Sequence, residues 1–276
     1  MEVKVGLIQM TCSDVPRENL DKIIAGIRDL AGRGAQIIST SELPSSKYFC
    51  QTKDDSRFAL AEAIPGPTTE KLSKVAAEGD VVILMSLFEK ADDGKFYNTV
   101  AVIDADGKYL GKYRKMHIPD DPENGYDEAY YFAKGDEGYK VFDTKYAKIA
   151  PMICYDQWFP EGARLAAAQG AQILFYPTAI GWPQKDRKEL NAAEHEAWQI
   201  MQRSHAIANN VFVCPINRVG VEGALKFWGT SFVSDPYGRV IAKADTESET
   251  NLLATCDLFV TDEMRKDWPF LKQYEV

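Results

Sequence analysis

Short segments rich in Val, Ile, Phe and Tyr alternate along this chain with longer amphipathic segments, and this alternation limits the possible folds more than any other feature. Short apolar runs bounded by Gly, Pro, Asn or Asp are typical of buried β-strands. Strands that alternate with helices predict an α/β fold in which helices cover the sheets. The predicted strands cover residues 3–9, 35–41, 81–89, 98–104, 109–117, 148–153, 172–176, 211–216, 230–234 and 252–256.

Four segments have the apolar spacing of helices. The first begins near Pro16, with Asp14 as its expected N-cap, and its apolar side chains recur at helical intervals as far as Gly32. Three more helices are expected from about residue 69 to 79, from 160 to 170 and from 188 to 209. Because most of these helices stand between two predicted strands, they are expected to pack on the outer faces of sheets.

A short sequence repeat divides the chain into two similar halves. Residues 34–38 (GAQII) and 170–174 (GAQIL) each follow a predicted helix and open a predicted strand. Two αβ halves that pack sheet against sheet would give a layered sandwich with its helices outside. No Pro- or Ser-rich linker separates the halves, so residues 1–276 are expected to form one domain.

Composition excludes several classes of protein. The chain has 32 basic and 41 acidic side chains, and no Lys/Arg stripe offsets its net charge of −9, which argues against nucleic acid as a partner. No apolar stretch approaches the ~18 residues that cross a bilayer. The first residues read as a strand and not as a signal peptide, so no membrane partner and a cytoplasmic location are expected. Five scattered cysteines without a C-x-x-C pair argue against disulfides and structural zinc.

Cys154 is the residue best placed for covalent chemistry. It follows an apolar strand pattern and precedes Pro160, which favours the first turn of a helix. Backbone N–H groups at such a junction can stabilise a thiolate and later an oxyanion. A buried, unreactive thiol is the alternative, and it is the interpretation for Cys214, whose neighbours are apolar. With three histidines and no H-E-x-x-H motif, no metal is expected.

Three charged residues could act together with this cysteine. Glu42 follows a strand pattern, where it is either a solvated loop residue or a general base at the rim of a sheet. Lys115 is either a surface lysine or, in a pocket, a cation that stabilises a tetrahedral oxyanion. Glu128 taken alone is interpreted as an exposed residue. The residues by themselves leave these alternatives open.

In this order, Glu42, Lys115 and Cys154 resemble the Glu–Lys–Cys triad of the nitrilase (carbon–nitrogen hydrolase) superfamily. The similarity covers almost the whole chain, from residues 5–9 through 111–115 and 153–156 to 227–231. It implies a four-layer αββα sandwich, with Glu42 as base, Lys115 at the oxyanion, Cys154 as nucleophile and Glu128 as a second glutamate. It implies neither a cofactor nor a metal. Members of the superfamily pair into dimers or larger assemblies, so a homo-oligomer is expected.

Four further segments are similar to the N-carbamoylputrescine amidohydrolases within this superfamily, namely residues 48–51, 117–122, 156–161 and 175–181. This similarity implies a small-molecule ureide or amide as substrate, with N-carbamoylputrescine hydrolysed to putrescine, carbon dioxide and ammonia. It places Tyr48, Tyr155 and Trp182 at the substrate. Tyr155 stands where that branch often has Trp, and Trp182-Pro183 stands where it commonly has Ser-Glu. The alternatives are a β-ureido acid, carbamoyl amino acid, aliphatic amide or nitrile as substrate, or a catalytically silent binding protein.

Overall fold

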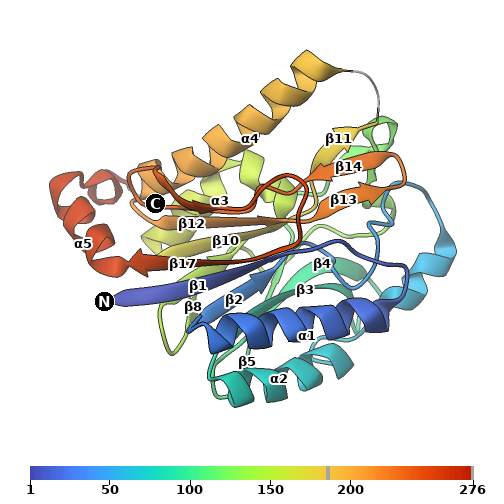
Figure 1. Ribbon diagram of the computed structural model, residues 1–276, viewed down its shortest axis with the longest axis horizontal. Coiled ribbons are helices and arrows are strands. Elements are labelled where there is room, and N and C mark those ends of the chain that lie inside the picture. The colour runs from blue at the N-terminus through green and yellow to red at the C-terminus, as the bar shows by residue number, and fades with distance from the viewer. Residues whose placement is uncertain (185–186, 275–276) are drawn as a thin grey trace.

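The computed structural model describes residues 1–184 and 187–274, and in it two six-stranded sheets face each other between layers of helices (Figure 1). The first sheet has the strand order β17-β1-β2-β3-β4-β5, with bounds Glu2–Gln9 (β1), Ile37–Thr40 (β2), Val82–Lys90 (β3), Phe96–Ile103 (β4), Tyr109–Arg114 (β5) and Thr250–Asp257 (β17). The second has the order β16-β15-β12-β10-β9-β8, with bounds Phe142–Asp143 (β8), Lys148–Pro151 (β9), Ile173–Thr178 (β10), Phe212–Asn217 (β12), Phe232–Ser234 (β15) and Val240–Lys243 (β16).

The two sheets repeat one arrangement. Strands β1, β2 and β3 are parallel, and β4 and β5 then continue the sheet antiparallel. In the same way β9, β10 and β12 are parallel, and β15 and β16 follow antiparallel. The repeated segments 34–38 and 170–174 occupy matching places, where a helix leads into the middle parallel strand. The prediction of two similar αβ halves is therefore confirmed.

Helices cover the outer face of each sheet. Apolar side chains of the first two helices, among them Ile23, Ile27 and Leu72, pack with Ile38 and Ile83 of the first sheet. Burying a side chain of this size contributes about 1.5–3 kcal/mol to stability. No helix within the described residues combines the length and apolar character that crossing a bilayer requires. The helices are Pro16–Gly32 (α1) and Pro67–Gly79 (α2) on the first sheet, Pro160–Ala168 (α3) and Lys188–Asn209 (α4) on the second, and Leu258–Asp267 (α5) after β17.

The space between the sheets is filled by apolar side chains from both halves. Val5 and Leu84 of the first sheet and Phe175 of the second are fully buried in one contiguous core. Alternate residues of a strand face the same side, so each strand contributes every second side chain to this interior. Toward the carboxyl ends of β2 and β10 the buried side chains become polar or charged, as at Glu42 and Thr178. This end of the sandwich holds the candidate site.

Several local predictions require correction. Val15, not Asp14, is the N-cap of α1, because the carboxylate of Asp14 instead pairs with the ammonium of Lys47 at 2.7 Å. Strand β5 ends at Arg114, so Lys115 lies just beyond it. The sequence did not predict a small three-stranded sheet of order β11-β14-β13, with bounds Gly181–Pro183 (β11), Val219–Glu222 (β13) and Leu225–Trp228 (β14). It also did not predict the short paired strands Asp120–Asp121 (β6) and Tyr126–Asp127 (β7). The remaining short elements are the 3₁₀ helices Asp55–Leu60 (η1), Pro122–Asn124 (η2), Glu128–Tyr130 (η3), Cys154–Trp158 (η4) and Phe270–Gln273 (η5).

Candidate active site

Glu42 lies two residues beyond the end of β2, in a turn that residues of the second half of the protein hold. Its backbone N–H donates to the carbonyl of Thr178, at the end of β10, over 3.3 Å. From the second half, Nη2 of Arg218 donates to the carbonyls of Glu42 (2.7 Å) and Leu43 (2.9 Å). Leu43 has φ +46°, a left-handed conformation that is unfavourable for leucine. The long-range hydrogen bonds therefore hold a turn that the local sequence alone would not favour.

The two oxygens of the Glu42 carboxylate have different surroundings. Oε1 accepts hydrogen bonds from Nδ2 of Asn98 and from Nζ of Lys115, each at 2.7 Å. Oε2 is buried and has no hydrogen-bond partner among the described residues. Such a buried, unpaired oxygen is costly to the fold. One oxygen is thus fixed in place, and the other is available to accept a proton.

The ammonium of Lys115 joins two buried carboxylates. Its Nζ lies 2.7 Å from Oε1 of Glu42 and 2.6 Å from Oε2 of Glu128, and all three side chains are fully buried. Burial disfavours the charged form of the lysine, but the charges of Glu128 and Glu42 outweigh it and raise the pKa of Lys115 well above its ordinary value. Lys115 is therefore a cation at every physiological pH.

Glu128 begins η3 and is fully buried, so its interpretation as an exposed residue is wrong. Its Oε1 accepts a hydrogen bond from the phenol of Tyr48 at 2.7 Å. Burial raises the pKa of Glu128 to about 7, against the opposing charge of Lys115. Burial and the Glu128 charge also raise the pKa of Tyr48 well above its usual range, so this phenol keeps its proton and donates it to the hydrogen bond.

Cys154 is the first residue of η4, at a sharp turn between β9 and α3. Its φ of +42° lies in the left-handed region, which residues other than glycine rarely adopt. Its Sγ lies 4.0 Å from the carbonyl oxygen of Ala179. Burial raises the pKa of the Cys154 thiol well above its ordinary value, Glu42 adds to the effect, and Lys115 opposes it. The thiol is protonated at neutral pH, so it needs a base before it can act as a nucleophile.

Asp156 holds the turn that carries Cys154. Its Oδ2 accepts from the backbone N–H of Ile153 (2.9 Å) and from the phenol of Tyr113 (2.7 Å). Its Oδ1 accepts from the backbone N–H of His117 (2.9 Å) and lies 2.9 Å from the Nδ1 of the same histidine. The sequence analysis missed this role. No local motif marks it, because Ile153 lacks the polar side chain of a capping box and the other partners, Tyr113 and His117, are distant in the chain.

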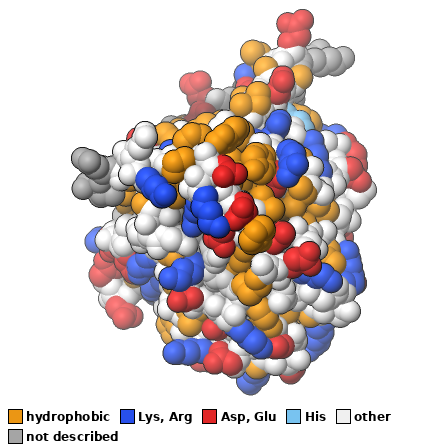
Figure 2. Space-filling view, turned by 90° about the vertical axis from the view of Figure 1, so that its left-hand side faces the viewer, with side chains coloured by type: hydrophobic (Ala, Val, Ile, Leu, Met, Phe, Trp, Pro, Cys, Tyr) orange, Lys and Arg blue, Asp and Glu red, His pale blue; other side chains and the backbone are white. Residues whose placement is uncertain are grey.

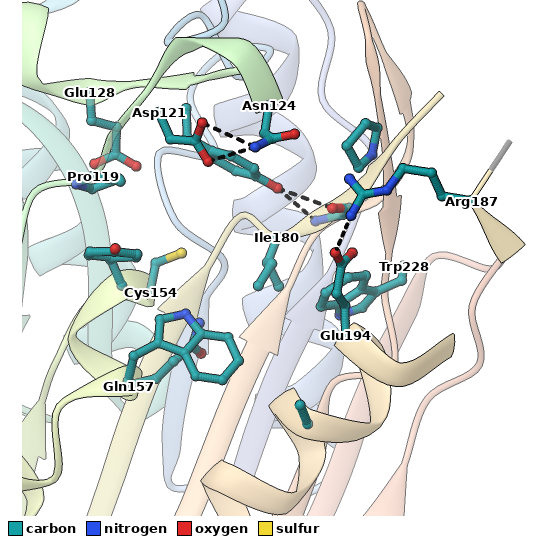
Figure 3. Close-up of a pocket in the computed structure, with 16 residues that line it drawn as sticks. Pro119, Asp121, Asn124, Glu128, Cys154, Gln157, Ile180, Arg187, Glu194 and Trp228 are labelled. Atoms are coloured by element: carbon teal, nitrogen blue, oxygen red, sulfur yellow. Dashed lines mark hydrogen bonds and ion pairs between the residues drawn. The ribbon is translucent and has the colours of Figure 1, made fainter. Parts of the chain in front are cut away.

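A cavity of about 320 Å³ leads to Cys154 and Glu128 (Figure 3). Aromatic side chains, among them Tyr155, Trp158 and Trp228, form part of its wall, and polar or charged side chains such as Asn124 and Glu194 form another part. Cavities of this kind, apolar with a few polar groups, bind small molecules. In the part of the chain that the structure describes, no cluster of three or more His, Cys, Asp or Glu side chains is placed to hold a metal ion.

Trp182, which was predicted to contact the substrate, lies outside the lining of this cavity. It belongs to β11, where neighbouring side chains point to opposite faces of the strand. Gly181 and Pro183 line the cavity, whereas the indole of Trp182 packs 5.4 Å from the ring of Trp228 and donates a hydrogen bond to the carbonyl of Asn191 at 2.7 Å. Trp182 thus packs against Trp228 of the cavity wall without lining the cavity itself, and its contact with a substrate stays a prediction.

Tyr48 also lies outside the cavity lining, and it contacts the site through the carboxylate of Glu128.

Two other neighbours of the charged cluster, Asn98 and Arg218, were not found from the sequence. Asn98 lies within β4 and Arg218 directly after β12, and both side chains are fully buried. A polar residue inside an apolar strand pattern was the one signal for Asn98. Arg218 gave no local signal, because its partners are distant in the chain.

A layered αββα sandwich with a buried Glu–Lys–Glu cluster beside a cysteine defines a class of hydrolase. The model of the carbon–nitrogen hydrolase family matches residues 4–266, and the chain belongs to this family. A solved structure of a carbon–nitrogen hydrolase from Helicobacter pylori G27 is similar over 100% of this chain and 96% of that chain, with a TM-score of 0.94 and 36% identity. The family and the fold predicted from the sequence are confirmed, and the chain is a carbon–nitrogen hydrolase.

Two curated relatives show where this chain stands within the family. It is 44% identical to the N-carbamoylputrescine amidase of Arabidopsis thaliana over 276 residues, which cover 97% of this chain and 90% of that protein. It is 42% identical to the citrullinase of Francisella tularensis subsp. tularensis over 270 residues, which cover 96% of this chain and 93% of that protein. Both comparisons thus extend over almost the whole chain.

Replacing Glu128 by Gln should change how the stability of the fold depends on pH. Folding raises the pKa of Glu128 from 4.5 to about 7, so between these values the folded protein holds a proton that the unfolded chain releases. The contribution of this group to the free energy of unfolding therefore falls as the pH rises through this interval. Urea denaturation should show that the difference in free energy of unfolding, wild type minus Glu128→Gln, decreases from about pH 4.5 to about pH 7.

Glu70→Gln is the matched control, because Glu70 is an exposed glutamate of α2. The difference between wild type and this control should show no such slope. Parallel pH curves for wild type and Glu128→Gln would contradict the assignment of a raised pKa to this carboxyl group.

Proposed function

We propose that this chain hydrolyses N-carbamoylputrescine to putrescine, carbon dioxide and ammonia. The observation that carries the proposal is one arrangement of charged groups. The protonated thiol of Cys154 and the carboxylate of Glu128 line the cavity, and Glu128 contacts a buried ammonium that also holds Glu42, whose Oε2 has no hydrogen-bond partner among the described residues. The plant relatives named N-carbamoylputrescine amidase, at 43–44% identity over 96–97% of this chain, support the choice of substrate.

In the proposed first step, Cys154 attacks the carbamoyl carbon of the substrate. Oε2 of Glu42 takes the proton from Sγ as the sulfur–carbon bond forms. This role fits the unpaired state of that oxygen and the raised pKa of the thiol. The carbonyl oxygen becomes an oxyanion in a tetrahedral intermediate.

The ammonium of Lys115 and the backbone N–H of Tyr155 would stabilise this oxyanion. Loss of one such donor typically lowers the rate by about 10²–10³. The bond to Glu128 supports the role of Lys115, because a second carboxylate besides Glu42 fixes the position of the ammonium. Glu128 also lines the cavity, where it can accept a hydrogen bond from a substrate nitrogen.

The intermediate then collapses, and the bond between the carbamoyl carbon and the putrescine nitrogen breaks. Glu42 returns the proton to that nitrogen, so putrescine leaves with a neutral amino group where the carbamoyl group was attached. A carbamoyl thioester remains on Cys154. A water molecule, deprotonated by Glu42, attacks the thioester carbon and releases the thiol. The carbamic acid formed in this way decomposes to carbon dioxide and ammonia, which balances the reaction.

We also propose that the chain forms a homo-oligomer and acts in the cytoplasm. Tyr237, Trp268 and Phe270 support the first point, because they remain 42%, 49% and 43% exposed although they are large and apolar. Figure 2 shows hydrophobic side chains among charged ones on the face that carries α5. Exposed aromatic groups of this kind are typical of protein–protein contacts. Five free, buried cysteines fit a reducing compartment.

A substrate panel tests the proposed reaction. Ammonia release should be measured with N-carbamoylputrescine, a β-ureido acid, an N-carbamoyl-D-amino acid, an aliphatic amide and a nitrile. N-carbamoylputrescine should give the highest kcat/KM of this panel, by roughly tenfold or more, since a matched polar end group gives discrimination of that order. A higher kcat/KM for the amide or the nitrile would overturn the choice of substrate.

Cys154→Ala and Cys154→Ser should each abolish turnover, because neither side chain offers a thiol to attack the carbamoyl carbon. Both proteins should keep the circular dichroism spectrum and the urea midpoint of a folded chain. Cys214→Ala is the matched control, since Cys214 is a core thiol of β12 and should not be needed for turnover. Ammonia release by either Cys154 variant at a rate near that of wild type would reject the nucleophile.

Glu42→Gln keeps the shape of the side chain but removes the base. Acylation, followed in a single turnover as release of putrescine, should slow by about 10²–10⁴, the usual contribution of a general base. Glu161→Gln, on the exposed first turn of α3, should leave the rate unchanged. Near-normal acylation by Glu42→Gln would show that the proton of the thiol goes to another group.

A further inference from the structure

An arginine and a glutamate form an ion pair in the wall of the cavity. Nη2 of Arg187 lies 2.9 Å from Oε1 of Glu194, and both residues line the cavity that leads to Cys154. Arg187 is the residue before α4, and Glu194 lies two turns into this helix. The side chains are 31% and 42% exposed, so a ligand can reach both groups. Figure 3 shows the pair on one side of the cavity, with Ile180 between it and Cys154 in this view.

This pair matches one chemical group better than any other. A carboxylate alone is complementary to an ammonium ion, and a guanidinium alone is complementary to a carboxylate. The head group of an α-amino acid carries an ammonium and a carboxylate on one carbon, so it can replace the Arg187–Glu194 contact with two charge-paired contacts. A simple amine can satisfy Glu194, but it brings a second cation close to Arg187.

N-carbamoylputrescine and L-citrulline, the substrates after which the two relatives are named, differ in this head group only. N-carbamoylputrescine ends in an ammonium group. An ω-ureido α-amino acid such as L-citrulline has the same ureido group and the same number of carbon atoms between the substituted ureido nitrogen and the ammonium. It differs in carrying a carboxylate on the carbon next to the ammonium. A single cavity that fits the first molecule therefore needs one additional cationic contact to accept the second.

We propose that Arg187 and Glu194 form the subsite for the distal end of the substrate, and that Arg187 gives the enzyme a second activity on ω-ureido α-amino acids. This inference rests on the proposed function, because it uses the same carbamoyl transfer to Cys154. Glu194 binds the distal ammonium of either substrate. Arg187 binds the α-carboxylate, which N-carbamoylputrescine lacks. The methylene groups lie along the apolar wall at Ile180 and Trp228.

The second reaction follows the same steps as the first. The sulfur of Cys154 bonds to the ureido carbon, and the bond from this carbon to the side-chain nitrogen of the amino acid breaks. The proton taken from the thiol passes to that nitrogen. One water molecule then hydrolyses the carbamoyl thioester. The products are a diamino acid, carbon dioxide and ammonia, with no oxidant or reductant required.

Asp121 is the other acidic side chain that could hold the distal ammonium at the mouth of this cavity. Both of its oxygens already accept hydrogen bonds from Nδ2 of Asn124, at 3.1 and 2.9 Å. No guanidinium lies beside it among the cavity-lining residues that the structure describes, apart from that of Arg187, which pairs with Glu194. The Arg187–Glu194 pair is therefore the better match for a head group of two charges.

The test compares kcat/KM for N-carbamoylputrescine and L-citrulline, measured by ammonia release, in wild type and single variants. Wild type should hydrolyse both. Arg187→Gln should raise KM for L-citrulline at least tenfold, since a charged hydrogen bond is lost. The same variant should lower KM for N-carbamoylputrescine, because Glu194 no longer shares its charge with a guanidinium. Glu194→Gln should raise KM for both substrates, with kcat changed less than KM.

Arg28→Gln is the matched control, because Arg28 forms an exposed ion pair with Glu78 at 3.2 Å on the outer layer of the first sheet. It should change neither KM. Circular dichroism of each variant shows that it is folded, and Arg187→Lys, which keeps a charge but not the forked guanidinium, should give a KM for L-citrulline between those of wild type and Arg187→Gln.

Each contrary result has a distinct meaning. Hydrolysis of N-carbamoylputrescine without hydrolysis of L-citrulline by wild type would overturn the second activity and leave the proposed function intact. An equal change in both KM values in Arg187→Gln would overturn the role of Arg187. A loss of binding in Asp121→Asn but not in Glu194→Gln would overturn the role of Glu194. If wild type released ammonia from neither ureide, the proposed function itself would fail.

Discussion

The buried ammonium of Lys115 is the interaction on which the rest of the site depends. Two carboxylates as close to one another as Glu42 and Glu128 would not both ionise in the interior of a protein without a cation between them. Lys115 supplies this cation, at 2.7 Å from one and 2.6 Å from the other. A buried group of this kind is costly if any partner is removed. The ends of β2 and β5 and the start of η3 must therefore meet in one geometry only, and the two-sheet sandwich provides that geometry.

The same environment divides the chemical roles among the groups. Removal from water keeps the thiol of Cys154 protonated, whereas Lys115 stays charged because its two carboxylates outweigh the cost of burial. A neutral nucleophile beside a base with an unpaired oxygen reacts only when a substrate carbon is present to accept the sulfur. The aromatic side chains of the cavity wall, which include Tyr155, Trp158 and Trp228, limit the access of water beside Cys154 and so strengthen the charge interactions there.

The sequence predicted those features that depend on local patterns. Strands and helices in the two halves follow from apolar spacing, and the order of Glu42, Lys115 and Cys154 identified the family. Features that depend on long-range contacts were not predictable. Asp14 is a good N-cap by type, but Lys47 draws its carboxylate away. The strand β11 is only three residues long, so the side on which Trp182 would lie could not be read from an alternating pattern. Asp156, Asn98 and Arg218 have no motif of their own, because their partners come from distant segments.

Arg218 has a consequence for how such a sandwich can evolve. Its guanidinium belongs to the second αβ half, yet it fixes the backbone of Glu42 and Leu43 in the first. The two halves repeat one strand arrangement, but they are therefore not independent modules. Recombination that exchanged one half for that of a distant family member could preserve both sheets and still present the Glu42 carboxylate in the wrong direction. The two halves must therefore be inherited together, because a residue of the second half fixes the position of the base in the first.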